Sequence, residues 1–157
     1  MRAVIQRVSQ AGVTIANRQT AKIGRGLLIL VGVEQGDTPA DAEWLAGKVV
    51  QLRIFPDDAG KMNRDVRAVD GNLLVVSQFT LLGDARKGNR PSFVQAARPE
   101  EAVPLYELFL NRLESRTGRR PQQGVFAADM QVSLINDGPV TILLDSRERS
   151  ATAASPS

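Results

Sequence analysis

The chain has 157 residues, 43% of them hydrophobic and 24% charged, a composition that indicates one globular domain and excludes disordered and fibrous classes. It contains no Cys and no His, which excludes disulfides, thiolate nucleophiles, Ser-His-Asp triads and metal sites ligated by Cys or His. The net charge of +3 is a mild bias, weaker than that of a protein whose whole surface binds nucleic acid.

Neither a membrane span nor a signal peptide is predicted. The longest apolar run, Leu27–Val33, is interrupted by Gly32 and falls well short of the roughly 20 residues needed to cross a bilayer. The first residues lead directly into a strand-like pattern, without the apolar segment and small-residue cleavage site of a signal peptide. We therefore expect a soluble, cytoplasmic protein with no membrane association.

The first third of the chain shows strand patterns followed by a helix pattern. Ala11-Gly12 separates the first two strand patterns, which we interpret as a hairpin. Thr38 suits the N-cap of the helix and Pro39 suits its first position, and apolar residues then recur along one helical stripe. The predicted elements are the strands Arg2–Ser9, Val13–Ala16 and Leu27–Val33 and the helix Pro39–Leu52.

The rest of the chain alternates strand, helix and strand patterns. The second helix begins near Pro99, carries acidic residues in its first turn and ends at Gly118, while Pro104 lies close enough to the start to be tolerated. The predicted strands are Arg53–Phe55, Asn72–Thr80, Met130–Ile135 and Val140–Leu144.

This order of elements predicts an α+β fold rather than a regular βαβ repeat. We expect one domain over residues 1–146, built as a mixed, strongly curved, barrel-like β-sheet system with two main helices packed outside. Residues 147–157 are charged, small or polar, and they are predicted to form a flexible C-terminal tail.

The first candidate site lies where an aliphatic strand becomes abruptly polar, at Ser77-Gln78-Phe79-Thr80. A loop with three cations, Arg86, Lys87 and Arg90, follows it. Hydroxyls at the end of a strand often bind only neighbouring backbone groups, and exposed charges are often only solvated surface. The residues alone therefore leave a structural and a functional interpretation open.

The second candidate site is Asn136-Asp137-Gly138-Pro139-Val140-Thr141. Asp-Gly between two strand patterns favours a type I′ hairpin turn. Pro139 complicates this interpretation, since X-Pro bonds are cis in about 5–6% of cases in folded proteins and a lasting cis bond usually has a purpose. Both interpretations remain open at this point.

Together these segments resemble the signature motifs of D-aminoacyl-tRNA deacylases. The resemblance rests on both candidate segments and on the loop between them, and it runs in order over roughly residues 1–146. Leu82-Gly83-Asp84-Ala85 departs from the family's usual pattern without touching either motif. The matching segments are Met1–Val8, Lys61–Asn63, Ser77–Leu81, Arg86–Phe93 and Asn136–Thr141.

The resemblance implies a homodimeric hydrolase that cuts the ester of D-aminoacyl-tRNA and of mischarged glycyl-tRNA. No metal or cofactor is expected, because the chain has no His or Cys and no acidic stretch with EF-hand-like spacing. Each active site is expected at the interface, with Ser77–Thr80 from one subunit and Gly138-Pro139 from the other. Backbone N–H groups near Gln78 and Phe79 are expected to stabilise the oxyanion, and the 2′-hydroxyl of the tRNA is expected to assist. Thr80 is assigned orientation rather than nucleophilic attack, because the chain supplies no base to activate it.

The resemblance also implies a chiral filter. A cis Gly138-Pro139 peptide is expected to present carbonyls that exclude an L-side chain, while Arg7 braces this element across the interface. The other implied site residues are Asn136 and Thr141 for substrate binding and Arg86, Lys87 and Arg90 for tRNA phosphates.

Two other functions are alternatives. A non-catalytic RNA- or DNA-binding module would use the basic loop, but the chain has only seven aromatic residues and no evident stacking platform. A hydrolase of small esters or peptides is the other alternative, and comparing D-Tyr-tRNA with a free D-amino-acid ester would discriminate it.

Overall fold

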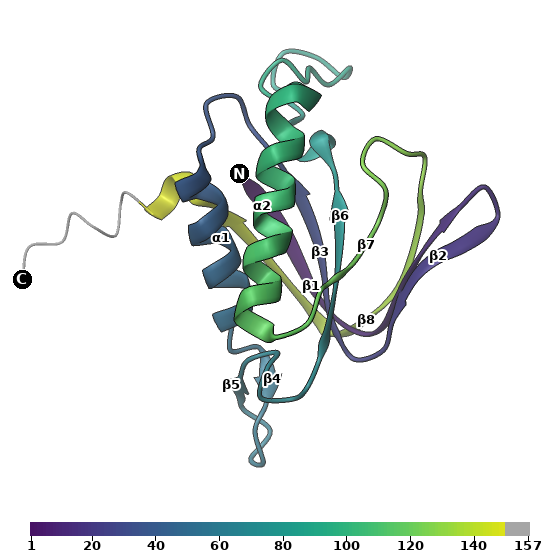
Figure 1. Ribbon diagram of the computed structural model, residues 1–157, viewed down its shortest axis with the longest axis vertical. Coiled ribbons are helices and arrows are strands. Elements are labelled where there is room, and N and C mark those ends of the chain that lie inside the picture. Colours follow the sequence, from purple (N-terminus) through teal and green to yellow (C-terminus); the bar gives the residue numbers. More distant parts are fainter. Residues whose placement is uncertain (150–157) are drawn as a thin grey trace, which may run out of the picture.

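The computed structural model describes residues 1–149, in which six strands form one mixed sheet beside two helices (Figure 1). The strand order is β2-β1-β3-β6-β7, and β8 also pairs with β1. The β3–β6 and β6–β7 pairs are parallel, and the other pairs in this sheet are antiparallel. The elements are β1 (Arg2–Ile15), β2 (Arg18–Ile23), β3 (Gly26–Gly32), α1 (Pro39–Gln51), β4 (Phe55–Pro56), β5 (Met62–Arg64), β6 (Asn72–Ser77), η1 (Phe79–Leu82), α2 (Pro99–Thr117), β7 (Gln122–Gln123), β8 (Gln131–Asp145) and η2 (Ser146–Glu148).

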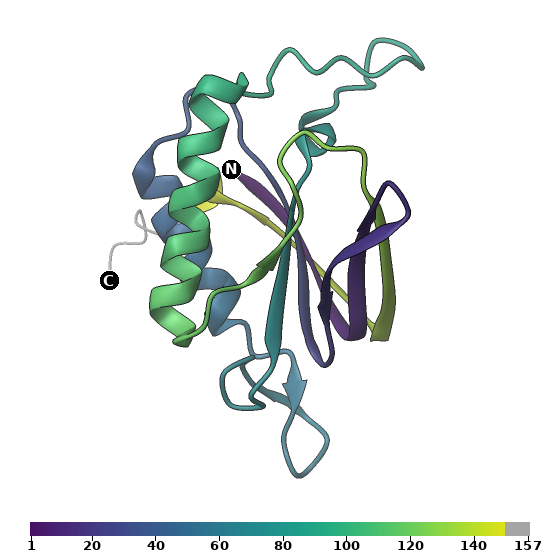
Figure 2. The same cartoon turned by 45° about the vertical axis from the view of Figure 1, so that its right-hand side comes forward.

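The sheet curls into a nearly closed barrel, and α1 and α2 lie side by side outside it (Figure 2). The prediction of an α+β fold with a curved mixed sheet and two external helices is therefore confirmed. None of the described helices is long and apolar enough to cross a lipid bilayer.

The strand β1 contributes to two hydrophobic cores. Ala3 and Ile5 are fully buried under the helices, whereas Val8 and Val13 are buried inside the curl of the sheet. Successive side chains of a strand point to opposite faces, so a long strand can serve both cores. Both faces of the sheet are thus covered, which explains the nearly continuous aliphatic sequence of β3.

Local signals place both helices where the sequence predicts them. The Asp41 carboxylate accepts a hydrogen bond of 2.7 Å from the backbone N–H of Thr38, the N-cap of α1. Burial of this carboxyl opposes its ionisation, but the hydrogen bonds from Thr38 and the nearby Arg149 guanidinium hold the pKa of Asp41 below its ordinary value. At the end of α2, Gly118 adopts φ 78°, the left-handed conformation that glycine tolerates best.

The predicted hairpin between residues 2–9 and 13–16 is wrong, because β1 runs unbroken through Gly12. Gly12 pairs with Lys22 on one side and Ser133 on the other. A Cβ at this position would lie 3.2 Å from the carbonyl oxygen of Ala21. The glycine therefore permits close approach between strands, and the turn lies at Ala16-Asn17, where both residues have positive φ.

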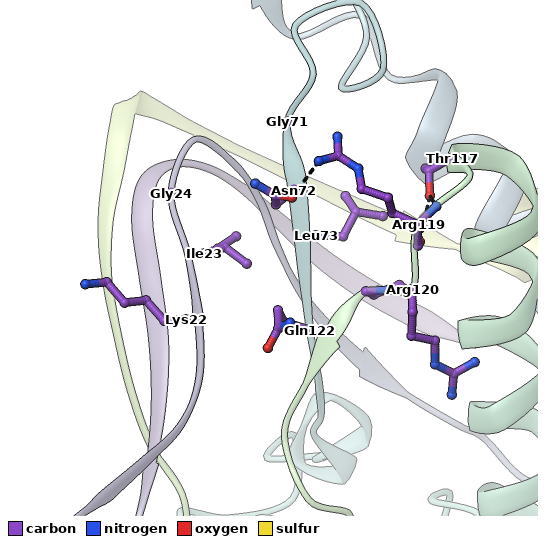
Figure 3. A pocket seen from close by; sticks show the side chains of 11 residues that line it. Lys22, Ile23, Gly24, Gly71, Asn72, Leu73, Thr117, Arg119, Arg120 and Gln122 are labelled. Carbon is purple, nitrogen blue, oxygen red and sulfur yellow. Dashed lines mark hydrogen bonds between the residues drawn. The ribbon is translucent and has the colours of Figure 1, made fainter.

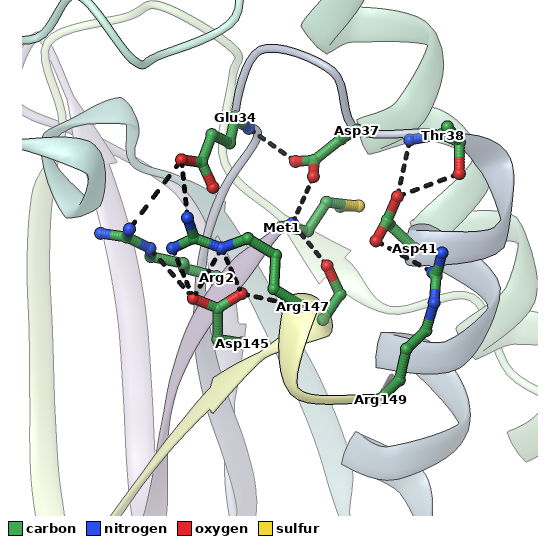
Figure 4. Close-up of polar contacts among 10 residues, drawn as sticks. Met1, Arg2, Glu34, Asp37, Thr38, Asp41, Asp145, Arg147 and Arg149 are labelled. Carbon is green, nitrogen blue, oxygen red and sulfur yellow. Dashed lines mark hydrogen bonds and ion pairs between the residues drawn. The ribbon is translucent and has the colours of Figure 1, made fainter. Parts of the chain in front are cut away.

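The residues just after β8 are held by a cluster of ion pairs (Figure 4). The buried Met1 ammonium donates to Ser146 Oγ at 2.7 Å and lies 2.8 Å from an Asp37 carboxylate oxygen. Arg147 pairs with Glu34 at 3.2 Å and with Asp145 at 2.8 Å. The segment predicted to be flexible from residue 147 therefore begins with anchored residues, and its remainder, 150–157, lies outside the described residues.

Candidate functional site

A cavity of about 510 Å³ opens where β6 ends. The buried strand β6 stops at Ser77, and the 3₁₀ helix η1 follows at once, so Ser77–Thr80 forms part of the cavity wall. We call this space the motif cavity. Its wall is largely apolar and includes the side chains of Phe79, Phe93, Tyr106, Phe126 and Met130.

Two hydrogen bonds set the geometry of the Ser77–Thr80 segment. The Gln78 N–H donates to the carbonyl of Val31 at 2.8 Å, and the Gln78 side-chain amide donates to Thr80 Oγ1 at 3.0 Å. The Gln78 N–H is thus already occupied, which corrects the expectation that it faces an oxyanion. The N–H groups of Phe79 and Thr80 have no acceptor among the described residues, as expected for the first turn of a helix.

Gly32 and Phe93 pack against this segment. A Cβ on Gly32, the last residue of β3, would lie 2.6 Å from Leu82 Cδ2 and 3.0 Å from the Gln78 carbonyl oxygen. Only glycine lets β3 end this close to η1 without displacing it. The rings of Phe79 and Phe93 meet edge to face with centroids 5.1 Å apart, although Phe79 remains 59% exposed.

Tyr106 is a buried wall residue of the motif cavity, and its ring contacts Phe126. Its hydroxyl has no hydrogen-bond partner within residues 1–149. Burial raises the pKa of Tyr106 to about 12, so the hydroxyl is protonated at neutral pH. Tyr106 can therefore donate a hydrogen bond, but it is not a general base.

The second motif is a bulge in β8 rather than a hairpin turn. Leu134 pairs with Ala11 and Thr141 pairs with Gln6, so β8 continues in one direction along β1 with two more residues than its partner. The Gly138-Pro139 peptide is cis, and Gly138 has φ 135°. The hairpin interpretation is thus wrong, and the cis bond is observed.

Side chains hold this bulge from both ends. The Asn136 amide spans it, accepting from the Val140 N–H at 3.0 Å and donating to the Val140 carbonyl at 3.2 Å. Arg7 donates to the Asp137 carbonyl at 3.0 Å and to the Ile54 carbonyl at 2.7 Å. Arg7 therefore braces the element within its own chain, whereas the sequence-based expectation placed this contact across an interface.

The two motifs do not meet within one chain. Gly138 and Pro139 are exposed and do not line the motif cavity, nor do Asn136, Thr141 or Arg7. Thr141 instead receives a weak hydrogen bond of 3.4 Å from the Gln6 side chain. On the same strand, Ile135 and Leu143 are 52% and 73% exposed, so β8 presents apolar side chains together with the bulge.

The basic loop after η1 carries less free charge than its sequence suggests. Asp84 accepts hydrogen bonds from the Arg86 guanidinium at 2.7 and 2.9 Å, and these bonds lower the pKa of Asp84 to about 2. Arg86 is thus largely neutralised within its own loop. Lys87 and Arg90 are exposed and form no ion pair with any described residue.

Sequence reasoning missed Arg98, which also lines the motif cavity. It precedes α2 directly, and the sequence offered only the signal of a cation next to the predicted helix start. Reasoning from the sequence also missed Phe93, Phe126 and Met130 as wall residues, since they come from loops and from the residue before β8.

A second cavity, of about 350 Å³, lies at the opposite end of β6, beside Asn72 (Figure 3). Its cations do not converge: Lys22 and Arg120 point away from each other, and Arg119 binds Asn72 at 3.2 Å and Asp70 at 2.6 Å. Within residues 1–149 there is also no group of three or more Asp and Glu side chains placed to hold a metal ion.

The family model and the curated relatives identify one family. The model of the family described as D-Tyr-tRNA(Tyr) deacylase matches residues 4–145. A D-aminoacyl-tRNA deacylase of Opitutus terrae is 60% identical over 149 residues, covering 95% of this chain and 99% of that protein. The solved structure of a c-Myc DNA Unwinding Element Binding Protein is 39% identical, with a TM-score of 0.86 and full coverage of both chains. A probable eukaryotic D-amino acid tRNA deacylase, 17% identical, shares the fold with a TM-score of 0.77 over 91% of this chain and 97% of that one.

Proposed function

The chain belongs to the D-Tyr-tRNA(Tyr) deacylase family, whose members hydrolyse ester bonds, and we propose that it releases D-amino acids and glycine from the terminal adenosine of tRNA. The observation that carries this proposal is the motif cavity. Its aromatic and thioether walls suit a nucleobase, and it lies beside two backbone N–H donors, of Phe79 and Thr80, that have no acceptor within residues 1–149. A nucleoside ester bound there would place its carbonyl next to Phe79 and Thr80.

The reaction needs only groups that this chain and its substrate supply. Water adds to the ester carbonyl carbon, and the resulting oxyanion accepts hydrogen bonds from the N–H groups of Phe79 and Thr80. The 2′-hydroxyl of the adenosine helps to position the water, and the tRNA 3′-oxygen leaves with the proton that the attacking water loses. Thr80 orients the site, since its Oγ1 already accepts a hydrogen bond from Gln78.

The chiral filter in this proposal comes from a second copy of the chain. Hydrogen bonds from Asn136 and Arg7 hold the bulge around Gly138. The bulge is exposed to solvent and does not line the motif cavity of its own chain. The exposed apolar side chains of β8 support a homodimer in which this bulge reaches the partner's motif cavity. There its backbone would exclude an L-side chain and admit a D-side chain or glycine.

Deacylation assays test the proposal. D-Tyr-tRNA and Gly-tRNA should be hydrolysed, whereas L-Tyr-tRNA and the methyl ester of free D-Tyr should not. Hydrolysis of the free ester at a rate similar to D-Tyr-tRNA would instead favour a small-ester hydrolase. Tight binding of tRNA or DNA without any hydrolysis would favour the nucleic-acid-binding alternative.

A further inference from the structure

Arg98 is the single charged side chain among the described residues that line the motif cavity. The rest of the wall is apolar or carries neutral hydroxyl, amide and backbone groups. An otherwise uncharged cavity with one cation is suited to a largely apolar ligand that carries a negative charge at one end.

The backbone on both sides of Arg98 is fixed. The N–H of Ala97 donates to the Val33 carbonyl at 2.9 Å, which attaches this segment to the end of β3. The N–H groups of Glu101 and Ala102 donate to the Arg98 carbonyl at 3.0 and 2.8 Å, which attaches it to α2. The side chain therefore projects from an anchored position at the cavity.

The guanidinium of Arg98 is also free to act. It is exposed, and within residues 1–149 it enters no ion pair. Arg86 in the loop after η1 and Arg119 at the cavity beside Asn72 behave differently, because Arg86 is bound by Asp84 and Arg119 by Asp70. Arg98 thus differs from both in having its charge uncompensated next to an apolar space.

We propose that Arg98 binds the phosphate on the 5′ side of the adenosine whose ester is cleaved, an inference that rests on the proposed function. The nucleoside occupies the apolar part of the motif cavity, and its 5′-phosphate is the one negative charge that must accompany it. A guanidinium matches a phosphate with paired N–H donors. Lys87 and Arg90, which do not line the cavity, are left for phosphates further along the strand.

Two minimal substrates isolate this contact: adenosine carrying a D-Tyr ester on its ribose, with and without a 5′-phosphate. Arg98→Ala should raise KM about tenfold for the phosphorylated substrate and for D-Tyr-tRNA, with kcat unchanged, because one charge-assisted hydrogen-bonded contact is lost. The unphosphorylated substrate should show no change. Arg98→Lys, which retains the charge without the paired donors, should recover part of the loss.

Arg119→Ala is the matched control, since Arg119 also lines a cavity but at the other end of β6 and is already paired. It should leave all KM values unchanged. An equal effect of both variants would show a general loss of positive charge and overturn the proposal. A KM increase in Arg98→Ala that is the same with and without the 5′-phosphate would overturn it as well.

Binding measured by calorimetry separates this inference from the proposed function. AMP should bind wild type more tightly than adenosine, and Arg98→Ala should abolish that difference. If wild type hydrolyses no D-aminoacyl ester, the proposed function fails, and the AMP and adenosine affinities still decide the role of Arg98. Equal affinities for AMP and adenosine in wild type would overturn it.

Discussion

The two motifs of this chain are built in opposite ways. Ser77–Thr80 lies at the end of β6, a largely buried strand that pairs with β3 along its whole length, and forms one wall of a cavity in its own chain. Gly138-Pro139 lies in an exposed bulge of β8 and does not line the motif cavity. The first motif has a cavity within its own chain, whereas the second is held by hydrogen bonds from Arg7 and Asn136 and does not line that cavity.

The proposed dimer is the part of this comparison for which we expect a single variant to have the largest effect. Leu143→Asp places a charge on the exposed apolar surface of β8, so the protein should become monomeric and lose deacylase activity while remaining folded. Light scattering and a deacylation assay measure this result. Val94→Asp is the control, because Val94 is equally exposed at 73% but lies outside β8, and it should leave the dimer intact. A fully active Leu143→Asp monomer would contradict the two-chain site.

Crowding the bulge should cost about 10²-fold in activity on D-substrates, the order expected when a site shifts by about 1 Å. In Gly138→Ala the new Cβ would lie 2.8 Å from Val140 Cγ2 and 3.1 Å from an Arg7 guanidinium nitrogen, at φ 135°. Gly60→Ala also places alanine at a positive φ, 78°, but in open space. It should lower the free energy of unfolding slightly and leave the rate unchanged, so equal rates in both variants would remove the bulge from the site.

Gly32→Ala tests the packing of β3 against the first motif. Overpacking between β3 and η1 should lower the free energy of unfolding by about 1–3 kcal/mol and displace Gln78, with a smaller loss of rate than in Gly138→Ala. Gly24→Ala is the control, since nothing lies within 4 Å of its added Cβ. Denaturant unfolding and kcat for D-Tyr-tRNA measure both effects, and an unaffected rate would show that the position of η1 is not critical.

Substitutions in the basic loop should have a smaller effect, on tRNA binding, and Arg86 should contribute less than Lys87. Because Arg86 is bound by Asp84, Arg86→Ala should change the salt dependence of tRNA binding less than Lys87→Ala. For Lys87→Ala, the slope of the logarithm of the binding constant against the logarithm of the salt concentration should change by about 0.7–0.9. The folded pKa of Asp84, about 2, is lower than its ordinary value. The ion pair therefore persists at neutral pH and is lost only as pH falls through that folded value. Equal slope changes for Arg86→Ala and Lys87→Ala at pH 7 would contradict this ranking.

Metal removal should have no effect at all. The chain has no His or Cys, and its proposed chemistry uses backbone N–H groups and the substrate. Rates measured before and after dialysis against EDTA should agree. A loss that a divalent cation restores would require a different mechanism for both motifs.

Short-range signals determined much of this protein from its sequence. Thr38-Pro39 and Pro99 marked the helix starts, Gly118 marked an end, and the abrupt polarity after Val76 located the first motif. These features depend on neighbours within one turn or one strand end, so the sequence contains them directly. The resemblance to a known family then supplied the roles that composition could not.

Tertiary structure decided the features that depend on distant partners. Gly12 and Asp137-Gly138 carry the same local signal as a turn, but each lies in a continuous strand because of its register with residues far along the chain. The motif cavity likewise exists only where β6, the start of α2 and the segment before β8 come together. Arg86 is paired with Asp84 in its own loop, whereas Arg98 lines the motif cavity and has no ion-pair partner within residues 1–149. The tertiary structure, and not the composition, therefore decides which of these cations is available to a ligand.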